Sequence, residues 1–175
     1  MEDNKNDILK HSATYGAIIG FALIIYTILL YIADLSLSRG LGYLSYVIII
    51  AGLFLSIKKF RENEPLDAIK YGKALGVGVL TCVFMGFIGS VFTYLQFRFL
   101  DPDLVNKILE MSEEKLLDKG LSEDMIEMQS EFMMKFMSPG IMALSSFISY
   151  IFMGTVFSLI LAAILKKEPN PMENQ

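Results

Sequence analysis

Residues 136–165 read FMSPGIMALSSFISYIFMGTVFSLILAAIL, thirty consecutive residues without a charged side chain. At about 1.5 Å of rise per residue, a helix of this length exceeds the hydrocarbon core of a bilayer, which is about 30 Å thick. The stretch is therefore predicted to contain a transmembrane helix. Three more uncharged stretches lie upstream, at residues 12–33, 40–57 and 74–97. The sequence predicts four spans, covering about residues 13–33, 41–57, 74–97 and 140–165.

The composition agrees with a chain whose solvent is mainly lipid. Of 175 residues, 54% are hydrophobic and only 19% are charged, with a mean hydropathy of +0.51. The leader MEDNKNDILK mixes acids with bases and no A-x-A follows the first span, so we expect that span to remain as an anchor rather than to be cleaved as a signal peptide. The predicted fold class is an all-α integral membrane protein that forms a single membrane domain over residues 1–175.

The distribution of Lys and Arg predicts the orientation of the spans. If the amino terminus is cytoplasmic, the inside segments hold nine basic residues: Lys5, Lys10, Lys58, Lys59, Arg61, Lys70, Lys73, Lys166 and Lys167. The outside segments hold six: Arg39, Arg98, Lys107, Lys115, Lys119 and Lys135. Because Lys and Arg are enriched in cytoplasmic segments beside spans, both termini are predicted to lie in the cytoplasm.

An acidic segment separates the third and fourth spans. Residues 99–135 hold ten acidic and four basic side chains, a net charge of -6, while the rest of the chain sums to +2. Apolar residues recur there at helical spacing, so residues 101–137 are predicted to form an amphipathic helical hairpin outside the membrane. Asp101-Pro102 is expected to begin its first helix, Gly120 to end it, and Ser122 to begin the second helix.

The second helix of this hairpin is rich in methionine and phenylalanine. Met125, Met128, Phe132 and Phe136 fall within about 80° of arc at 100° per residue, flanked by Ile126, Met133 and Met137. Glu127, Glu131 and Lys135 occupy the opposite side. Ser138-Pro139 is then expected to end this helix and begin the next, which makes a hinge at the membrane entrance.

Two interpretations of the sulfur-bearing residues stay open. The thioethers of Met125 and Met128, or of Met133 and Met137, lie one turn apart and suit Cu(I). Adaptable apolar packing is the favoured interpretation, because no Cys or His supports these thioethers and Phe and Ile share the same face. Cys82 is the only cysteine and His11 the only histidine, so the chain has no zinc constellation of Cys and His. In mid-span, Cys82 is expected to be a small packing residue.

Small residues recur every four positions in three spans. The ridges are Ser12, Gly16 and Gly20; Ala74, Gly78, Cys82, Gly86 and Ser90; and Gly154, Ser158 and Ala162. Such ridges allow helix backbones to approach closely in lipid. They are expected to pack the bundle internally, with self-association of the chain as the alternative.

The spans contain no ionisable Asp, Glu, Lys or Arg at depth, which disfavours coupled ion transport. No hydrolase, nucleotide-binding or metal motif occurs in the chain, so we expect neither an enzyme nor a cofactor. With a pI near 5.0 the chain is not expected to bind nucleic acid.

The sequence resembles the bacterial membrane-protein family catalogued as domain of unknown function 4199. The stretches that carry this resemblance are TYGAIIGFALIIYTILLY, YGKALGVGVL, FTYLQFRFLDPDL, KFMSPGIM and LAAILKKEPNP, and it extends from about Leu9 to Lys167. It implies four spans, a helical outer loop and a location in the inner membrane of Gram-negative bacteria, and it supplies no functional residues.

Two functions are compatible with these observations. The first is a binding or accessory module, in which Met125, Met128, Phe132, Met133 and Phe136 present a surface to lipid or to a membrane-protein partner. The second is a small transporter or lipid-handling protein for a neutral or amphipathic molecule, with a cleft lined by Ser145, Ser149 and Tyr150 and the hairpin as a lid.

Overall fold

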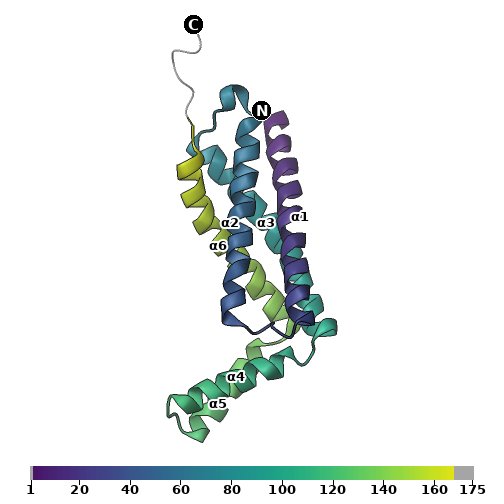
Figure 1. Ribbon diagram of the computed structural model, residues 1–175, viewed down its shortest axis with the longest axis vertical. Coiled ribbons are helices and arrows are strands. Elements are labelled where there is room, and N and C mark those ends of the chain that lie inside the picture. The colour runs from purple at the N-terminus through teal and green to yellow at the C-terminus, as the bar shows by residue number, and fades with distance from the viewer. Residues whose placement is uncertain (1, 168–175) are drawn as a thin grey trace. The chain divides into compact units, whose positions relative to one another are not determined.

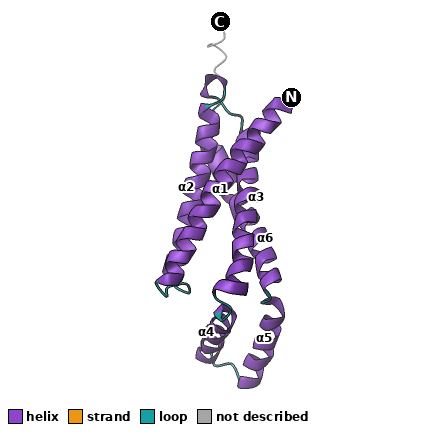
Figure 2. Cartoon of the chain, turned by 90° about the vertical axis from the view of Figure 1, so that its right-hand side faces the viewer, coloured by secondary structure: helices purple, strands orange, loops and turns teal. Residues whose placement is uncertain are grey.

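The computed structural model describes residues 2–167, and the regular elements of this part of the chain are all helices (Figure 2). The predicted all-α fold is confirmed. Four helices are long and apolar enough to cross a membrane: α1 (Glu2–Ile32), α2 (Arg39–Glu62), α3 (Tyr71–Leu95) and α6 (Pro139–Leu165). Two shorter and more polar α-helices, α4 (Leu104–Asp118) and α5 (Glu123–Phe136), separate α3 from α6 in the sequence. The chain is thus a multi-pass membrane protein by the length and composition of its helices.

The long helices extend beyond the uncharged stretches that predicted them. The helix α1 begins at Glu2 rather than near residue 13, and α2 continues past residue 57 to Glu62. The helix α3 passes into a five-residue π-helical turn, Gln96–Leu100. Absence of charge marks the part of a helix that lies in hydrocarbon, whereas backbone hydrogen bonding continues into the flanking polar segments.

The chain forms two compact units. The first contains Met1–Gly89 and Phe147–Gln175, and the second contains Ser90–Ser146. In the first unit, which we call the bundle, α1, α2 and the larger parts of α3 and α6 run side by side (Figure 1). The second unit, which we call the α4–α5 unit, holds α4, α5 and the adjoining ends of α3 and α6.

The helix α3 lies at the centre of the bundle. Its side chains Ala74, Val77, Thr81, Cys82 and Met85 are fully buried. On the α1 side, a Cβ atom at Gly16 would lie 2.6 Å from Cβ of Phe84 and 2.8 Å from the carbonyl oxygen of Thr81. A residue with a side chain does not fit there, so Gly16 allows α1 and α3 to pack backbone to backbone.

The helix α6 contacts the small-residue ridge of α3 itself, at Gly78 and Cys82. A Cβ at Gly78 would lie 2.5 Å from Oγ of Ser158, and one at Gly154 would collide with Sγ of Cys82. The Cys82 thiol is 3.9 Å from the Ser158 hydroxyl. The ridges therefore pack α1, α3 and α6 of one chain against each other, which confirms the expected internal role and the packing role of Cys82.

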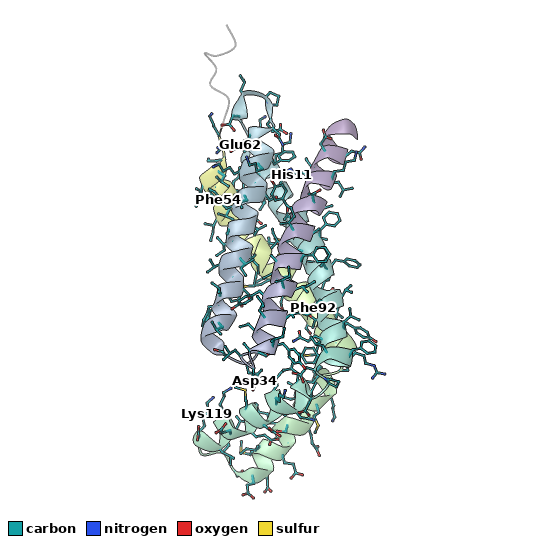
Figure 3. The ribbon with its side chains drawn as sticks, turned by 45° about the vertical axis from the view of Figure 1, so that its right-hand side comes forward. His11, Asp34, Phe54, Glu62, Phe92 and Lys119 are labelled. Atoms are coloured by element: carbon teal, nitrogen blue, oxygen red, sulfur yellow. The ribbon has the colours of Figure 1, made fainter. Side chains whose placement is uncertain are left out.

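The start of α1, the α2–α3 linker and the end of α6 lie at one end of the bundle. Backbone hydrogen bonds join Ile69 and Lys167 in both directions, at 2.9 and 3.0 Å. Arg61 donates to the carbonyl of Leu165 at 3.3 Å and to the Asp67 carboxylate at 3.2 Å. Figure 3 shows His11 and Glu62 toward this end and Asp34, in the α1–α2 loop, at the other. Because four spans are an even number, the start of the first span and the end of the last lie at the same end of the bundle.

The turn between α4 and α5 follows the sequence prediction. Gly120 has a φ of +77°, which favours glycine. Its N–H donates to Leu117 O at 2.8 Å and that of Leu121 donates to Leu116 O at 3.2 Å, the two bonds of a Schellman motif. Ser122 is the N-cap residue of α5, as expected.

The predicted start of α4 was wrong by two residues. The helix begins at Leu104, and Asp103 rather than Asp101 occupies the N-cap position. Asp101 ends the π-helical turn instead, where it is buried and forms an ion pair with Lys107 at 3.4 Å. Pro102 lies in the turn between the two helical segments rather than in the first turn of α4.

Candidate functional site

One side of α5 exposes large apolar side chains. Met125, Met128, Phe132 and Phe136 are 51%, 68%, 61% and 52% exposed, and we call these four residues the Met face. The ring centroids of Phe132 and Phe136 lie 5.0 Å apart, with the ring planes tilted by 52°. The predicted apolar arc exists, and the rest of the chain leaves more than half of each of its four residues exposed. Exposed apolar clusters of this kind are typical of interaction surfaces.

A different side of α5 packs against α4. Ile126 and Ser130 are buried, and Met133 Sδ accepts a hydrogen bond from the Ser112 hydroxyl at 3.6 Å. The sequence had grouped Ile126 and Met133 with the Met face as its flanks. The structure instead assigns them to the contact with α4, so the α4–α5 pair is held together without using the Met face. Met134 is exposed on the side opposite Met125 and lies outside the apolar arc that the sequence predicts.

The thioethers of α5 are divided between these two sides. Met125 and Met128 are exposed, whereas Met133 is engaged by Ser112 in the contact with α4. Met133 thus lies on a different side of α5 from Met125 and Met128, so these three thioethers do not converge on one point.

The junction between α5 and α6 has the predicted break. The helix α5 ends at Phe136 and α6 begins at Pro139. The Ser138 hydroxyl accepts a hydrogen bond from the N–H of Ile141 at 3.4 Å, which satisfies one of the free donors at the start of α6. Proline has no N–H and is therefore well suited to the first turn.

A layer of hydroxyl groups lies inside the bundle where α1, α2 and α3 meet. Ser12 Oγ donates to Val77 O at 3.3 Å, Thr81 Oγ1 donates to the same carbonyl at 2.8 Å, and Ser56 and Thr81 share a 3.0 Å hydrogen bond. His11 Nε2 lies 2.9 Å from the carbonyl of Ser56. These groups bond to one another and to the backbone, which indicates a structural role in lipid, where an unsatisfied polar group is costly.

The hydroxyl-bearing residues of the fourth span, α6, do not share one environment. Ser145 and Ser149 are exposed. A Cβ at Gly89 would lie 2.8 Å from the ring of Tyr150, so this tyrosine packs against α3. Ser149 and Tyr150, which the transporter hypothesis placed together in a cleft, thus face different surroundings.

The basic residues at the linker end of the bundle are largely matched by carboxylates. Lys73 pairs with Glu64 at 2.7 Å, and Lys59 pairs with Glu62 at 2.8 Å. Ion pairs of this kind, exposed or half-buried, add little to stability.

Comparisons with known proteins identify one family. The family described as "Protein of unknown function (DUF4199)" matches the chain over residues 14–167. No curated protein and no solved structure matches the chain.

Proposed function

Because this chain belongs to the DUF4199 family, whose function is unknown, we propose its role from its own residues: a bacterial inner-membrane protein that acts as a binding or accessory module and not as an enzyme. The observation that carries the proposal is the Met face of α5, exposed on a helix that already has its contact with α4. The bundle anchors the module in the membrane, and the α4–α5 unit presents the binding surface outside it as a helical hairpin.

The orientation of the module follows from its basic residues. The linker end of the bundle carries Arg61, Lys70 and Lys73, and α6 ends beside Lys166 and Lys167. The positive-inside rule assigns this end to the cytoplasm, which directs the loop at Asp34 and the α4–α5 unit to the other side of the membrane.

The chemistry of the Met face suits a partner of irregular shape. Methionine is flexible and polarisable, so it adapts to varied surfaces, while Phe132 supplies a rigid anchor. Burying Met128 and Phe132, now 68% and 61% exposed, would contribute about 2–4 kcal/mol before the entropic cost of association is subtracted. A partner already confined to the same membrane has less translational freedom to lose, which lowers that cost.

The charge of the segment favours a protein over a lipid surface as the partner. Helices that bind bilayers combine an apolar face with Lys and Arg that attract anionic lipid. The segment of residues 99–135 instead carries a net charge of -6, with Glu127 and Glu131 on the polar side of α5. An anionic membrane surface repels this charge. A membrane protein with an apolar groove bordered by Lys or Arg fits both the face and its surroundings.

Photo-crosslinking in intact cells tests the proposal. A photoreactive residue at Phe132, on the Met face, is expected to give a discrete protein adduct, and the same residue at Glu127 on the polar side is not. Met128→Glu should abolish the adduct. Met134→Glu is the matched control, because Met134 is similarly exposed, at 53%, but lies on the other side of α5. Lipid or intramolecular adducts alone from Phe132 would refute a partner-binding role.

A further inference from the structure

A groove of about 460 Å³ runs between α4 and α5, formed by residues of the α4–α5 unit only. It is distinct from the Met face, because Glu127, which lines it, lies about 200° around the helix from Met125 at 100° per residue. Its apolar lining consists of Ile126, which is buried, and of Leu117 and Met134, which are exposed at its edges. A concave surface that combines apolar side chains with a few polar groups is the usual form of a small-molecule site.

Four carboxylates border this groove. Glu113 comes from α4, and Glu123, Glu127 and Glu131 come from α5. None of the four is in an ion pair with any residue that the structure describes. By contrast, the carboxylates of the α2–α3 linker, such as Glu64, are paired with lysine or arginine. The groove therefore concentrates negative charge that the chain itself leaves uncompensated, and a cation that enters it relieves the repulsion.

A second and independent feature of the groove is Ser130. Its side chain is only 6% exposed and lines the groove. Among residues 2–167 its hydroxyl has no hydrogen-bond partner, although it is not sealed from the groove. Ser130 thus supplies a free polar group that a bound molecule with hydrogen-bonding capacity can engage.

The spacing of the carboxylates selects the kind of cation. Among the described residues, no three acidic, His or Cys side chains are grouped closely enough to hold a metal ion. Glu123, Glu127 and Glu131 instead recur every four residues, which separates them by about 6 Å of helical rise. Two amines joined by four methylenes are also about 6 Å apart when extended, since five bonds of about 1.5 Å in zigzag span that length.

We propose that this groove binds a linear aliphatic polyamine of the spermidine class. Its ammonium groups pair with successive glutamates along α5 and its methylenes lie on Leu117, Ile126 and Met134. An amine N–H donates to the Ser130 hydroxyl. Each feature of the ligand then has a matching feature of the groove.

Calorimetric titration of spermidine into the full-length protein, in an uncharged detergent, tests this assignment. Wild type is expected to bind one spermidine, and the double variant Glu127→Gln/Glu131→Gln is expected to bind it about tenfold more weakly or worse. The matched control is Glu110→Gln/Glu114→Gln, which removes two exposed carboxylates at the same spacing on α4, outside the groove. The control is expected to bind as wild type does, and circular dichroism verifies that both variants are folded.

Three outcomes would overturn the proposal. Equal weakening in both double variants would mean that spermidine only joins the diffuse ion atmosphere of an acidic unit. Displacement of spermidine by Mg²⁺ at an equal concentration of positive charge would also mean that binding is only diffuse ion association. Absence of binding to folded wild type at low ionic strength would exclude a polyamine site altogether. Ser130→Ala is expected to weaken spermidine binding threefold to tenfold, and unchanged affinity would overturn the assigned hydrogen bond to this hydroxyl.

Discussion

Replacing Gly78 by alanine should force α3 and α6 apart. The new Cβ would lie 2.5 Å from Oγ of Ser158 and 2.8 Å from its Cβ, whereas ordinary contacts begin at 3.4 Å. The two helices must therefore separate by about 0.9 Å at this point, or the Ser158 rotamer must change. Neither adjustment is free, because the Ser158 side chain is completely buried.

Overpacking of this kind costs about 1–3 kcal/mol. Gly76→Ala is the matched control, because a Cβ at Gly76 meets nothing within 4 Å and the substitution lies on the same helix. Both variants gain the same intrinsic helix propensity, about 1 kcal/mol, so their difference isolates the clash. In a chain of this size the difference corresponds to a melting temperature of Gly78→Ala about 2–12 °C below that of Gly76→Ala. Thermal unfolding in mild detergent, followed by circular dichroism, measures it.

A double-mutant cycle checks that the cost arises at Ser158. Ser158→Gly removes the side chain that the new methyl group would strike, so combining it with Gly78→Ala should recover the lost stability as a coupling energy of about 1–3 kcal/mol. The reasoning fails if the Gly78→Ala and Gly76→Ala variants have the same melting temperature. It also fails if the two substitutions at positions 78 and 158 are simply additive.

Three further substitutions test other contacts. Gly120→Ala places a side chain at a φ of +77° and should cost about 1–2 kcal/mol, seen as faster amide exchange at the end of α4; unchanged exchange would contradict the Schellman turn. Arg61→Gln removes the ion pair and the hydrogen bond to Leu165 O, so protease cleavage after the end of α6 should become faster than in wild type. Tyr26→Phe loses a 2.7 Å hydrogen bond to Leu41 O, and a loss of about 0.5–1.5 kcal/mol in unfolding free energy is expected; no loss would show that the hydroxyl is equally well solvated elsewhere.

The fold was largely predictable because the rules that govern it are local. Uncharged length predicts a span, Gly120 predicts a helix end, and Ser138-Pro139 predicts a helix start. The recurring small residues also indicated which helix faces come together. The error at Asp101-Pro102 has a physical cause: the π-helical turn Gln96–Leu100 shifts the chain, so that Asp101 ends one helical segment and cannot cap the next.

The candidate surfaces were only partly predictable. A helical wheel places Ile126 and Met133 next to Met125, but only the position of α4 decides which of them are covered. Likewise the sequence shows that residues 99–135 are acidic, while the groove appears only once Glu113 of α4 is set beside the glutamates of α5. Both features depend on how two helices pack, which spacing along one helix does not determine.

The central position of α3 has a consequence for how the chain is assembled in the membrane. The helices α1 and α2 are synthesised first, yet the hydroxyls of Ser12 and Ser56 bond to Val77 and Thr81 of α3. Until α3 enters the bilayer, these two serines must turn back onto their own helices or face lipid. The first hairpin is therefore an incomplete folding unit, and insertion of the third span supplies the hydrogen-bond partners of these two serines.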